Sequence, residues 1–402
     1  MPLKPHHFLI AMLFLLSFRA HGEPAGSGPP NILFIAVDDL RPELACYGAS
    51  YIHSPNIDQL ADEGVLFQNH FVNVPTCGSS RHCLVTGQLP TSPDHLRNDV
   101  TANTLSRSEE TDVPESFIHH LRRNGYHTIG IGKITHSPDG RVYGYLEEKS
   151  DILELPYSWD EMLLNDGKWG TGHNAFFGYA DGSNRNARDK EVKPYEAAKV
   201  GDKGYVDGLT AELAVRKLNE LEERGKPFFL GVGFFKPHLP FNAPKKYWDL
   251  YDRSALPIAP FADIPTDASK ASLHGSGELN QYRRGEEKAS LEAPVSDAYA
   301  RKLRHAYAAS VSYIDAQWRK RKSRQRNRKH NGSLSHDIGS DRTQAGPQDR
   351  WKQPSWFLTR RGNRELAQYG LQLFQERRNF PAHGKVPIDP LHPGCRTADR
   401  IV

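Results

Sequence analysis

The chain has 402 residues and a formal net charge of +4, and 38% of its residues are hydrophobic while 25% are charged. These values suit one large α/β domain or two domains of ordinary size, and exclude a chain too polar to build a core. Four cysteines are too few for a disulfide scaffold at this length, although one bridge could form. They are Cys46, Cys77, Cys83 and Cys395.

Residues 1–22 have the features of a signal peptide. The basic Lys4 precedes an apolar run at 8–18, and the small-x-small triplet AHG stands before Glu23. The run is short for a bilayer span and no stop-transfer sequence follows, which disfavours the alternative of an uncleaved anchor. The sequence therefore predicts export to a periplasmic, extracellular or lysosome-like compartment, without stable insertion in a membrane.

A strand and then a helix are predicted after this leader. Residues 31–37, NILFIAV, form a nearly continuous apolar run, which is typical of a strand buried on both faces of a parallel sheet. Asp38 and Asp39 follow directly, and in such sheets ligands bind beyond the carboxyl ends of the strands. Further on, Ser54 and Pro55 resemble a helix cap with proline in the first turn.

The same alternation recurs further along the chain. A helix-like segment at 113–126 leads into the short strand of HTIGIGKITH, and a helix at about 210–223 leads into a buried strand at 228–234. This order indicates an α/β domain with a largely parallel sheet. The stretches 140–205 and 252–296, rich in Gly, Pro, Asp and Lys, are predicted to be long surface insertions.

A helix at 301–317 ends the regular pattern, and the composition then changes abruptly. Residues 318–402 carry 19 Lys and Arg against 7 Asp and Glu, whereas residues 1–317 carry 33 against 41. We interpret 23–317 as one catalytic domain and 318–402 as a basic, aperiodic tail. Our preferred hypothesis for the tail is a shifted reading frame; the alternative is a solvated or disordered segment that binds anionic polysaccharide or nucleic acid.

The segment VPTCGSSRHCLVTG places a thiol four residues before an arginine. Cys77 and Arg81 would lie at the start of a helix, where the positive helix end and the guanidinium suit an anion. The residues alone leave three interpretations of Cys77 open: a half-cystine, an ordinary core thiol, or the precursor of a catalytic group.

Charged residues also follow each predicted strand. The adjacent carboxylates of Asp38 and Asp39 repel one another unless a cation neutralises them; alternatively, one caps a helix and the other faces water. The motifs GKITH and KPHLPF supply two lysines and two histidines, which would form a cationic pocket for a tetrahedral dianion or serve as solvated loop residues. These residues are Lys133, His136, Lys236 and His238.

Taken in order, several motifs resemble those of the sulfatase family, nearest to its iduronate-2-sulfatase-like branch. They are DDLRPELACYG, SPNIDQLA, CGSSR, GKITH, KPHLPF and SYIDAQ, within a resemblance that covers residues 30–317. The resemblance implies an alkaline-phosphatase-like α/β fold, a sheet flanked by helices, with the C-terminal part lost or replaced. It also implies hydrolysis of the sulfate esters of sulfated sugars, with calcium (Ca2+) as cofactor.

The resemblance also implies roles for individual residues. A maturation enzyme would oxidise Cys77 to formylglycine, whose hydrated aldehyde attacks sulfur and displaces the sugar alcohol. Calcium would be held partly by Asp38, Asp39 and residue 77, while Arg81 steadies the hydrated aldehyde. Lys236 would support the residues that hold the sulfate and handle protons, since cations match the charge that develops there. Those residues are Lys133, His136 and His238.

The chain departs from the family pattern in two places. Ser79 stands where the family usually has Pro or Ala. The family's second pair of metal ligands falls in the basic tail, where SHDIGSD has a different order and no preceding apolar strand, so we assign no ligand there. The alternatives to a sulfatase are a phosphoesterase of the same fold, which normally has Ser or Thr at position 77, and a non-catalytic binder of anionic polysaccharide. No nucleic-acid partner is expected.

Overall fold

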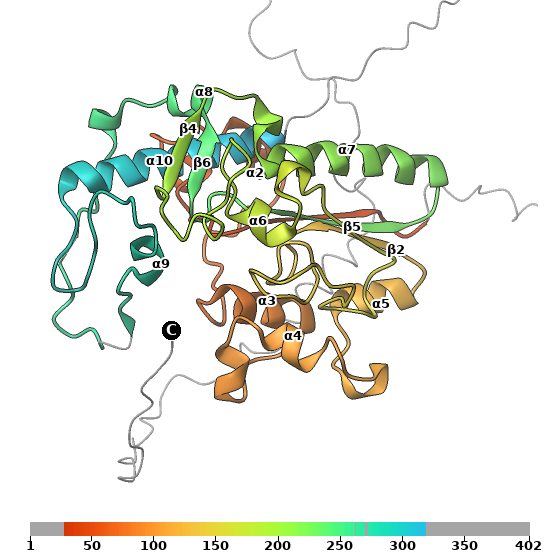
Figure 1. Ribbon diagram of the computed structural model, residues 1–402. Helices are drawn as coiled ribbons and strands as arrows, with labels where there is room; N and C mark the ends of the chain where they lie inside the picture. Colours follow the sequence, from red (N-terminus) through yellow and green to blue (C-terminus); the bar gives the residue numbers. More distant parts are fainter. Residues whose placement is uncertain (1–27, 262, 270–271, 319–402) are drawn as a thin grey trace, which may run out of the picture. The chain divides into compact units, whose positions relative to one another are not determined.

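The computed structural model describes residues 28–261, 263–269 and 272–318 (Figure 1). The predicted signal peptide and all of the predicted tail beyond Trp318 lie outside these residues and stay predictions. The strands are β1 (Ile32–Val37), β2 (His127–Gly132), β3 (Glu161–Leu163), β4 (Tyr195–Ala198), β5 (Phe228–Phe234) and β6 (Phe241–Pro244). The helices are α2 (Pro55–Glu63), α3 (Cys77–Thr86), α4 (Val100–Thr104), α5 (Phe117–Arg123), α6 (Gly172–Phe176), α7 (Val206–Arg224), α8 (Lys245–Trp248), α9 (Gly277–Asn280) and α10 (Asp297–Gln317).

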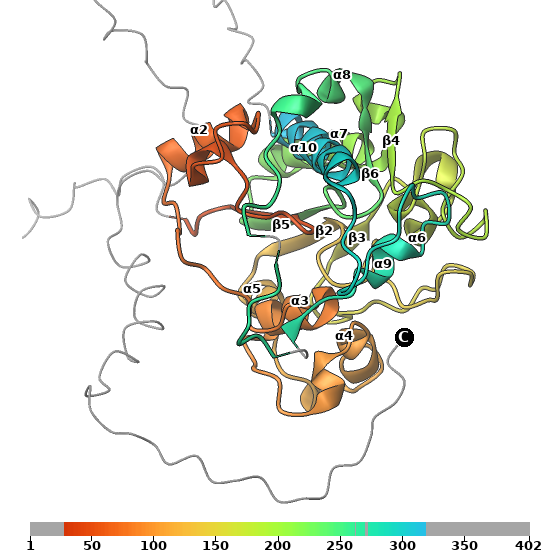
Figure 2. The same cartoon turned by 90° about the vertical axis from the view of Figure 1, so that its left-hand side faces the viewer.

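Four strands form a parallel sheet in the order β1-β5-β2-β3, and β4 pairs with β6 in a separate parallel ribbon. Figures 1 and 2 both show α7 and α10 on one side of the larger sheet and α3 and α5 on the other. The predicted α/β class, with a parallel sheet flanked by helices, is confirmed. Because the strands are parallel, the carboxyl ends of β1, β5 and β2 lie at the same edge.

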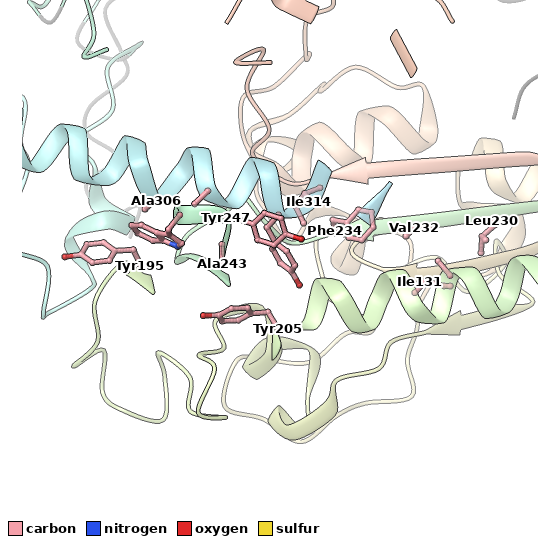
Figure 3. Close-up of a cluster of buried hydrophobic side chains, with 14 of the residues drawn as sticks. Ile131, Tyr195, Tyr205, Leu230, Val232, Phe234, Ala243, Tyr247, Ala306 and Ile314 are labelled. Carbon is pink, nitrogen blue, oxygen red and sulfur yellow. The ribbon is translucent and has the colours of Figure 1, made fainter. Parts of the chain in front are cut away.

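The central strand β5 shows why the two helical layers pack where they do. Leu230, Val232 and Phe234 point to the side of α7 and α10 and join a core that includes Ile131 and Ile314 (Figure 3). Phe229, which directly precedes Leu230, points to the opposite side of the sheet and packs with residues of α3 and α5. Successive side chains of a strand alternate between faces, so a continuously apolar strand fills two cores. Each such buried side chain contributes about 1.5–3 kcal/mol.

The first strand differs from the prediction in its burial. All six residues of β1 are only partly buried, and within the described residues β1 pairs with β5 alone. The strand is therefore at an edge of the sheet as described, although its apolar sequence is typical of an interior strand. The loop at 65–72 adds four exposed apolar side chains. These are Val65, Phe67, Phe71 and Val72.

The two stretches predicted as surface insertions are partly built into the fold, so that prediction was wrong in part. Residues 140–205 supply β3, α6 and β4, and Trp169, Phe176 and Phe177 there are buried in a core of their own. Their apolar residues occur in runs too short to show a helical or strand period. None of the described helices combines the length and the apolar character that a bilayer span requires.

Candidate functional site

The site forms where three parallel strands end and one helix begins. Asp38 follows β1, Lys133 follows β2, and Lys236 follows β5, while Cys77 is the first residue of α3. A close approach between two of these strand ends requires glycine, because a Cβ on Gly233 would lie 2.1 Å from the carbonyl oxygen of Lys133. The predicted convergence of charged residues at one sheet edge follows from this topology.

Asp38 is the centre of a buried charge cluster. Its Oδ1 accepts hydrogen bonds from Arg81 Nη2 at 2.9 Å and from the Cys77 thiol at 3.3 Å. Its Oδ2 accepts one from Lys133 Nζ at 2.6 Å. Burial alone would raise the pKa of Asp38, but the charges of Lys133 and Arg81 outweigh it and hold that pKa well below its usual range. The carboxylate is therefore ionised between two cations.

Arg81 is fixed by backbone contacts as well as by Asp38. Its Nη1 donates to the carbonyl oxygens of Lys133 at 2.6 Å and Ile134 at 3.0 Å. One turn earlier on α3, Cys77 is a free thiol whose pKa is raised by burial despite the charge of Lys133. A protonated thiol is a weak nucleophile. Unmodified Cys77 is thus close to an anion-binding cluster but poorly prepared for thiolate chemistry.

The two predicted histidines differ in environment. His136 has its Nδ1 buried without a hydrogen-bond partner among the described residues, and burial, with a contribution from Lys133, lowers its pKa to about 3. His238 Nδ1 donates to the carbonyl oxygen of Leu239 at 2.7 Å. Its Nε2 lies 3.7 Å from Asp39 Oδ2 and 3.6 Å from Glu278 Oε2.

Lys236 supports the loop that carries His238. Its Nζ donates to the carbonyl oxygens of His238 at 3.0 Å and Phe176 at 3.4 Å. Its backbone N–H donates to Asp207, a fully buried carboxylate whose pKa is raised by burial to about 6. The loop also contains cis peptide bonds before Pro237 and Pro240. The predicted contact of Lys236 with substrate stays a prediction.

Several residues of the site were not predicted from the sequence. The ring of Phe176 lies beside the charge cluster, with Lys133 Nζ 4.2 Å from its centroid and the His238 ring centroid at 4.6 Å. Phe176 belongs to a stretch predicted as an insertion, and no periodic pattern marked it. Asp207 lies in the first turn of α7, where an acidic residue is expected for helix stability alone, so its position gave no functional signal.

The described residues do not by themselves form a calcium site. Calcium takes six to eight oxygen ligands, roughly, whereas this pocket offers two aspartates, and both oxygens of Asp38 already bind cationic side chains. Within the described residues no group of three or more His, Cys, Asp or Glu side chains is arranged to hold a metal ion. The expected ligand role of Asp38, Asp39 and residue 77 stays a prediction, and SHDIGSD lies outside the described residues.

Comparison with known proteins supports the resemblance to the sulfatase family that the motifs indicate. The family described as "Sulfatase" matches residues 30–320. Iduronate 2-sulfatase of Mus musculus is 32% identical over 297 residues, which are 71% of this chain and 50% of that protein. The choline-sulfatase of Rhizobium meliloti (strain 1021) is 29% identical over 302 residues, 72% of this chain and 52% of that protein.

Among solved structures, the phosphonate monoester hydrolase of Agrobacterium radiobacter is similar with a TM-score of 0.48 and 23% identity, covering 72% of this chain and 58% of that chain. The chain spans about half the length of the curated relatives it matches. The family match covers most of the sequence and includes every element that builds the pocket. The chain therefore belongs to the sulfatase family, in which it is similar to the iduronate 2-sulfatases.

Proposed function

We propose that the chain is an exported hydrolase of sulfate esters on sulfated sugars, with residue 77 as nucleophile after a maturation enzyme converts Cys77 to formylglycine. One observation carries the proposal: the buried cluster sets two cations, Lys133 and Arg81, against one carboxylate, Asp38. The excess positive charge is out of water, where its attraction for an anion is strong. It lies beside residue 77, where the sulfate would bind.

Formylglycine would supply a hydrated aldehyde: one hydroxyl would attack sulfur as the bond from sulfur to the sugar oxygen breaks, and loss of the proton of the second hydroxyl would then expel sulfate and restore the aldehyde. The chain's own residues do the rest. Lys133 and Arg81 neutralise charge that develops on the sulfate oxygens. His136, neutral because of its low pKa, holds a sulfate oxygen through a ring N–H. Because Nδ1–H of His238 is committed to Leu239, Nε2 is the atom that exchanges protons, and in the imidazolium form it donates the proton that the departing sugar alcohol needs.

The test is hydrolysis by the full chain co-expressed with a formylglycine-generating enzyme. We expect sulfate release from a sulfated monosaccharide by the unmodified sequence and none by Cys77→Ala. Phosphate release from a phosphate monoester that survives in Cys77→Ser, with no sulfatase activity in the parent, would instead support a phosphoesterase. Salt-sensitive heparin binding without sulfate release, lost when 318–402 is deleted, would support a polysaccharide-binding protein.

A further inference from the structure

Arg185 is a buried cation that the proposed mechanism does not use. Its side chain is 7% exposed, and its guanidinium carbon lies 3.5 Å from the centroid of the Phe177 ring and 5.3 Å from that of Tyr282. Its Nη1 donates to Glu278 Oε1 at 3.2 Å, while its Nε is buried without a hydrogen-bond partner among the described residues. Aromatic rings thus hold the guanidinium in place, while its Nε–H donor is left without an acceptor among the described residues.

Glu278 joins Arg185 to the pocket. One carboxylate oxygen binds Arg185, and the other lies 3.6 Å from His238 Nε2. The Glu278 side chain is 36% exposed, far more than that of Arg185, so the ion pair joins a buried guanidinium to a carboxylate that solvent reaches. His238 also has Asp39 within 3.7 Å and therefore does not depend on Glu278 for a negative neighbour.

A pair of adjacent rings links Arg185 to the charge cluster. Lys133 and His238 lie against the ring of Phe176, and Arg185 lies against the ring of Phe177. The centroids of these two rings are 4.8 Å apart. Tyr145, whose ring centroid is 5.7 Å from that of Phe177, is 47% exposed beside them. Two cations, Lys133 and Arg185, therefore lie against adjacent rings.

We propose that Arg185 is a second anion-binding position beside the sulfate-binding cluster. In the free chain Glu278 occupies this position, and when a sugar binds, an acidic group of the sugar replaces Glu278 there. This inference rests on the proposed function. The acidic group is a carboxylate or a further sulfate on the same sugar, since both match the planar donors of a guanidinium. Glu278 then acts as an internal competitor that disfavours neutral sugars, because these cannot replace its carboxylate.

The test is calorimetric binding of two probes to the full chain: a methyl hexuronoside with one sulfate ester, and its carboxyl-reduced counterpart with the same sulfate. We expect the acidic probe to bind about tenfold more tightly. Arg185→Met should abolish that preference and leave the reduced probe unaffected. Glu278→Gln should tighten only the acidic probe, by about two- to fivefold. Arg188→Met, at an exposed ion pair with Asp181 in the same segment, is the matched control and should change neither affinity.

Opposite effects of the two variants distinguish an anion-binding position from a structural salt bridge. If Arg185 and Glu278 form only a structural salt bridge, each variant would weaken the binding of both probes. That result, or an absence of preference in the parent chain, would overturn the inference while sulfate binding stands. Binding of neither probe would overturn the proposed function and the inference with it. If Arg185→Met fails to fold, Glu278→Gln decides alone, because neither a structural salt bridge nor a general loss of negative charge predicts a gain in affinity confined to the acidic probe.

Discussion

Asp38 is the residue on which the charges of the site depend. Its side chain is 3% exposed, and both oxygens bind cations whose own side chains are at most 10% exposed. Two buried cations around one carboxylate are costly to desolvate unless their bonds are made. Removing one partner therefore changes the free energy of unfolding more than removing either member of a surface ion pair does.

Lys133→Met should lower the free energy of unfolding by about 3 kcal/mol, because the buried Oδ2 of Asp38 would lose the hydrogen-bond donor that it has in the described structure. The measurement is urea unfolding followed by tryptophan fluorescence. Lys203→Met is the matched control: Lys203 lies 2.8 Å from Glu212, but the two side chains are 61% and 44% exposed. Equal unfolding midpoints for the two variants would contradict the assignment of Lys133 to a buried ion cluster.

His136 should make the fold less stable in mild acid. Burial lowers its folded pKa to about 3, whereas in the unfolded chain the pKa is about 6.5. The unfolded chain therefore binds the proton first, so the stabilising contribution is present above about pH 6.5 and is lost as the pH falls toward about 3. Between about pH 7 and pH 5 the unmodified chain should lose about 1–2 kcal/mol more than His136→Gln.

Denaturant unfolding at the two pH values measures this difference. His70→Gln, which removes an imidazole from an exposed position, is the control and should follow the unmodified chain. The same pH dependence in His136→Gln as in the parent would show that His136 is not buried as described.

At the scale of elements, the end of α10 completes the start of α2. Ser54 precedes Pro55 as the sequence predicts, but its hydroxyl makes no capping bond. Asp315, near the end of α10, caps α2 instead: its Oδ1 accepts from the backbone N–H groups of Asn56 at 3.0 Å and Ile57 at 2.8 Å. A carboxylate at a helix N-terminus satisfies free N–H donors and the helix dipole together.

Asp315→Ala should destabilise the fold by about 2 kcal/mol, and Asp315→Asn by about 1 kcal/mol, since an amide oxygen can still accept one of the bonds. Asp297→Ala, at an exposed position in the first turn of α10, is the control and should cost less than either. Thermal and urea unfolding measure the stability that each of these three variants loses. If Asp315→Ala proved no worse than Asp297→Ala, the link between α10 and α2 would be wrong.

The elements with strong apolar patterns could be predicted from the sequence. The strand at 228–234 was predicted with both ends correct, and α7 extends the predicted helix by only a few residues. The strand ends then gave the positions of Asp38, Lys133 and His238. The remaining site residues could not be found in this way, because Phe176, Arg185 and Glu278 come from aperiodic segments that meet only in the folded chain.

At the scale of the whole molecule, the described fold leaves apolar surface in contact with water. Phe71 is 82% and Val65 80% exposed, and β1 has one side without a partner strand among the described residues. Exposed apolar groups and open strand edges favour association. This could not be predicted from the apolar run of β1, which looks like that of an interior strand.

We expect the purified chain to self-associate with increasing concentration, and Phe71→Lys to reduce this by placing a charge in the apolar loop at 65–72. Leu146→Lys is the matched control, because Leu146 is 84% exposed but lies elsewhere in the chain. Sedimentation velocity over a range of concentrations measures the effect. A parent chain that stays monomeric throughout, or equal effects of the two lysines, would rule out association through this loop.

We propose that residue 77, once converted to formylglycine beside Lys133 and Arg81, cleaves sulfate esters. The most direct measurement relates sulfate release to the fraction of residue 77 present as aldehyde, determined by peptide mass spectrometry, in preparations with graded levels of the maturation enzyme. The rate of sulfate release should be proportional to that fraction and should be zero in Cys77→Ala. A rate independent of conversion, or no release from a folded and fully converted chain, would contradict it.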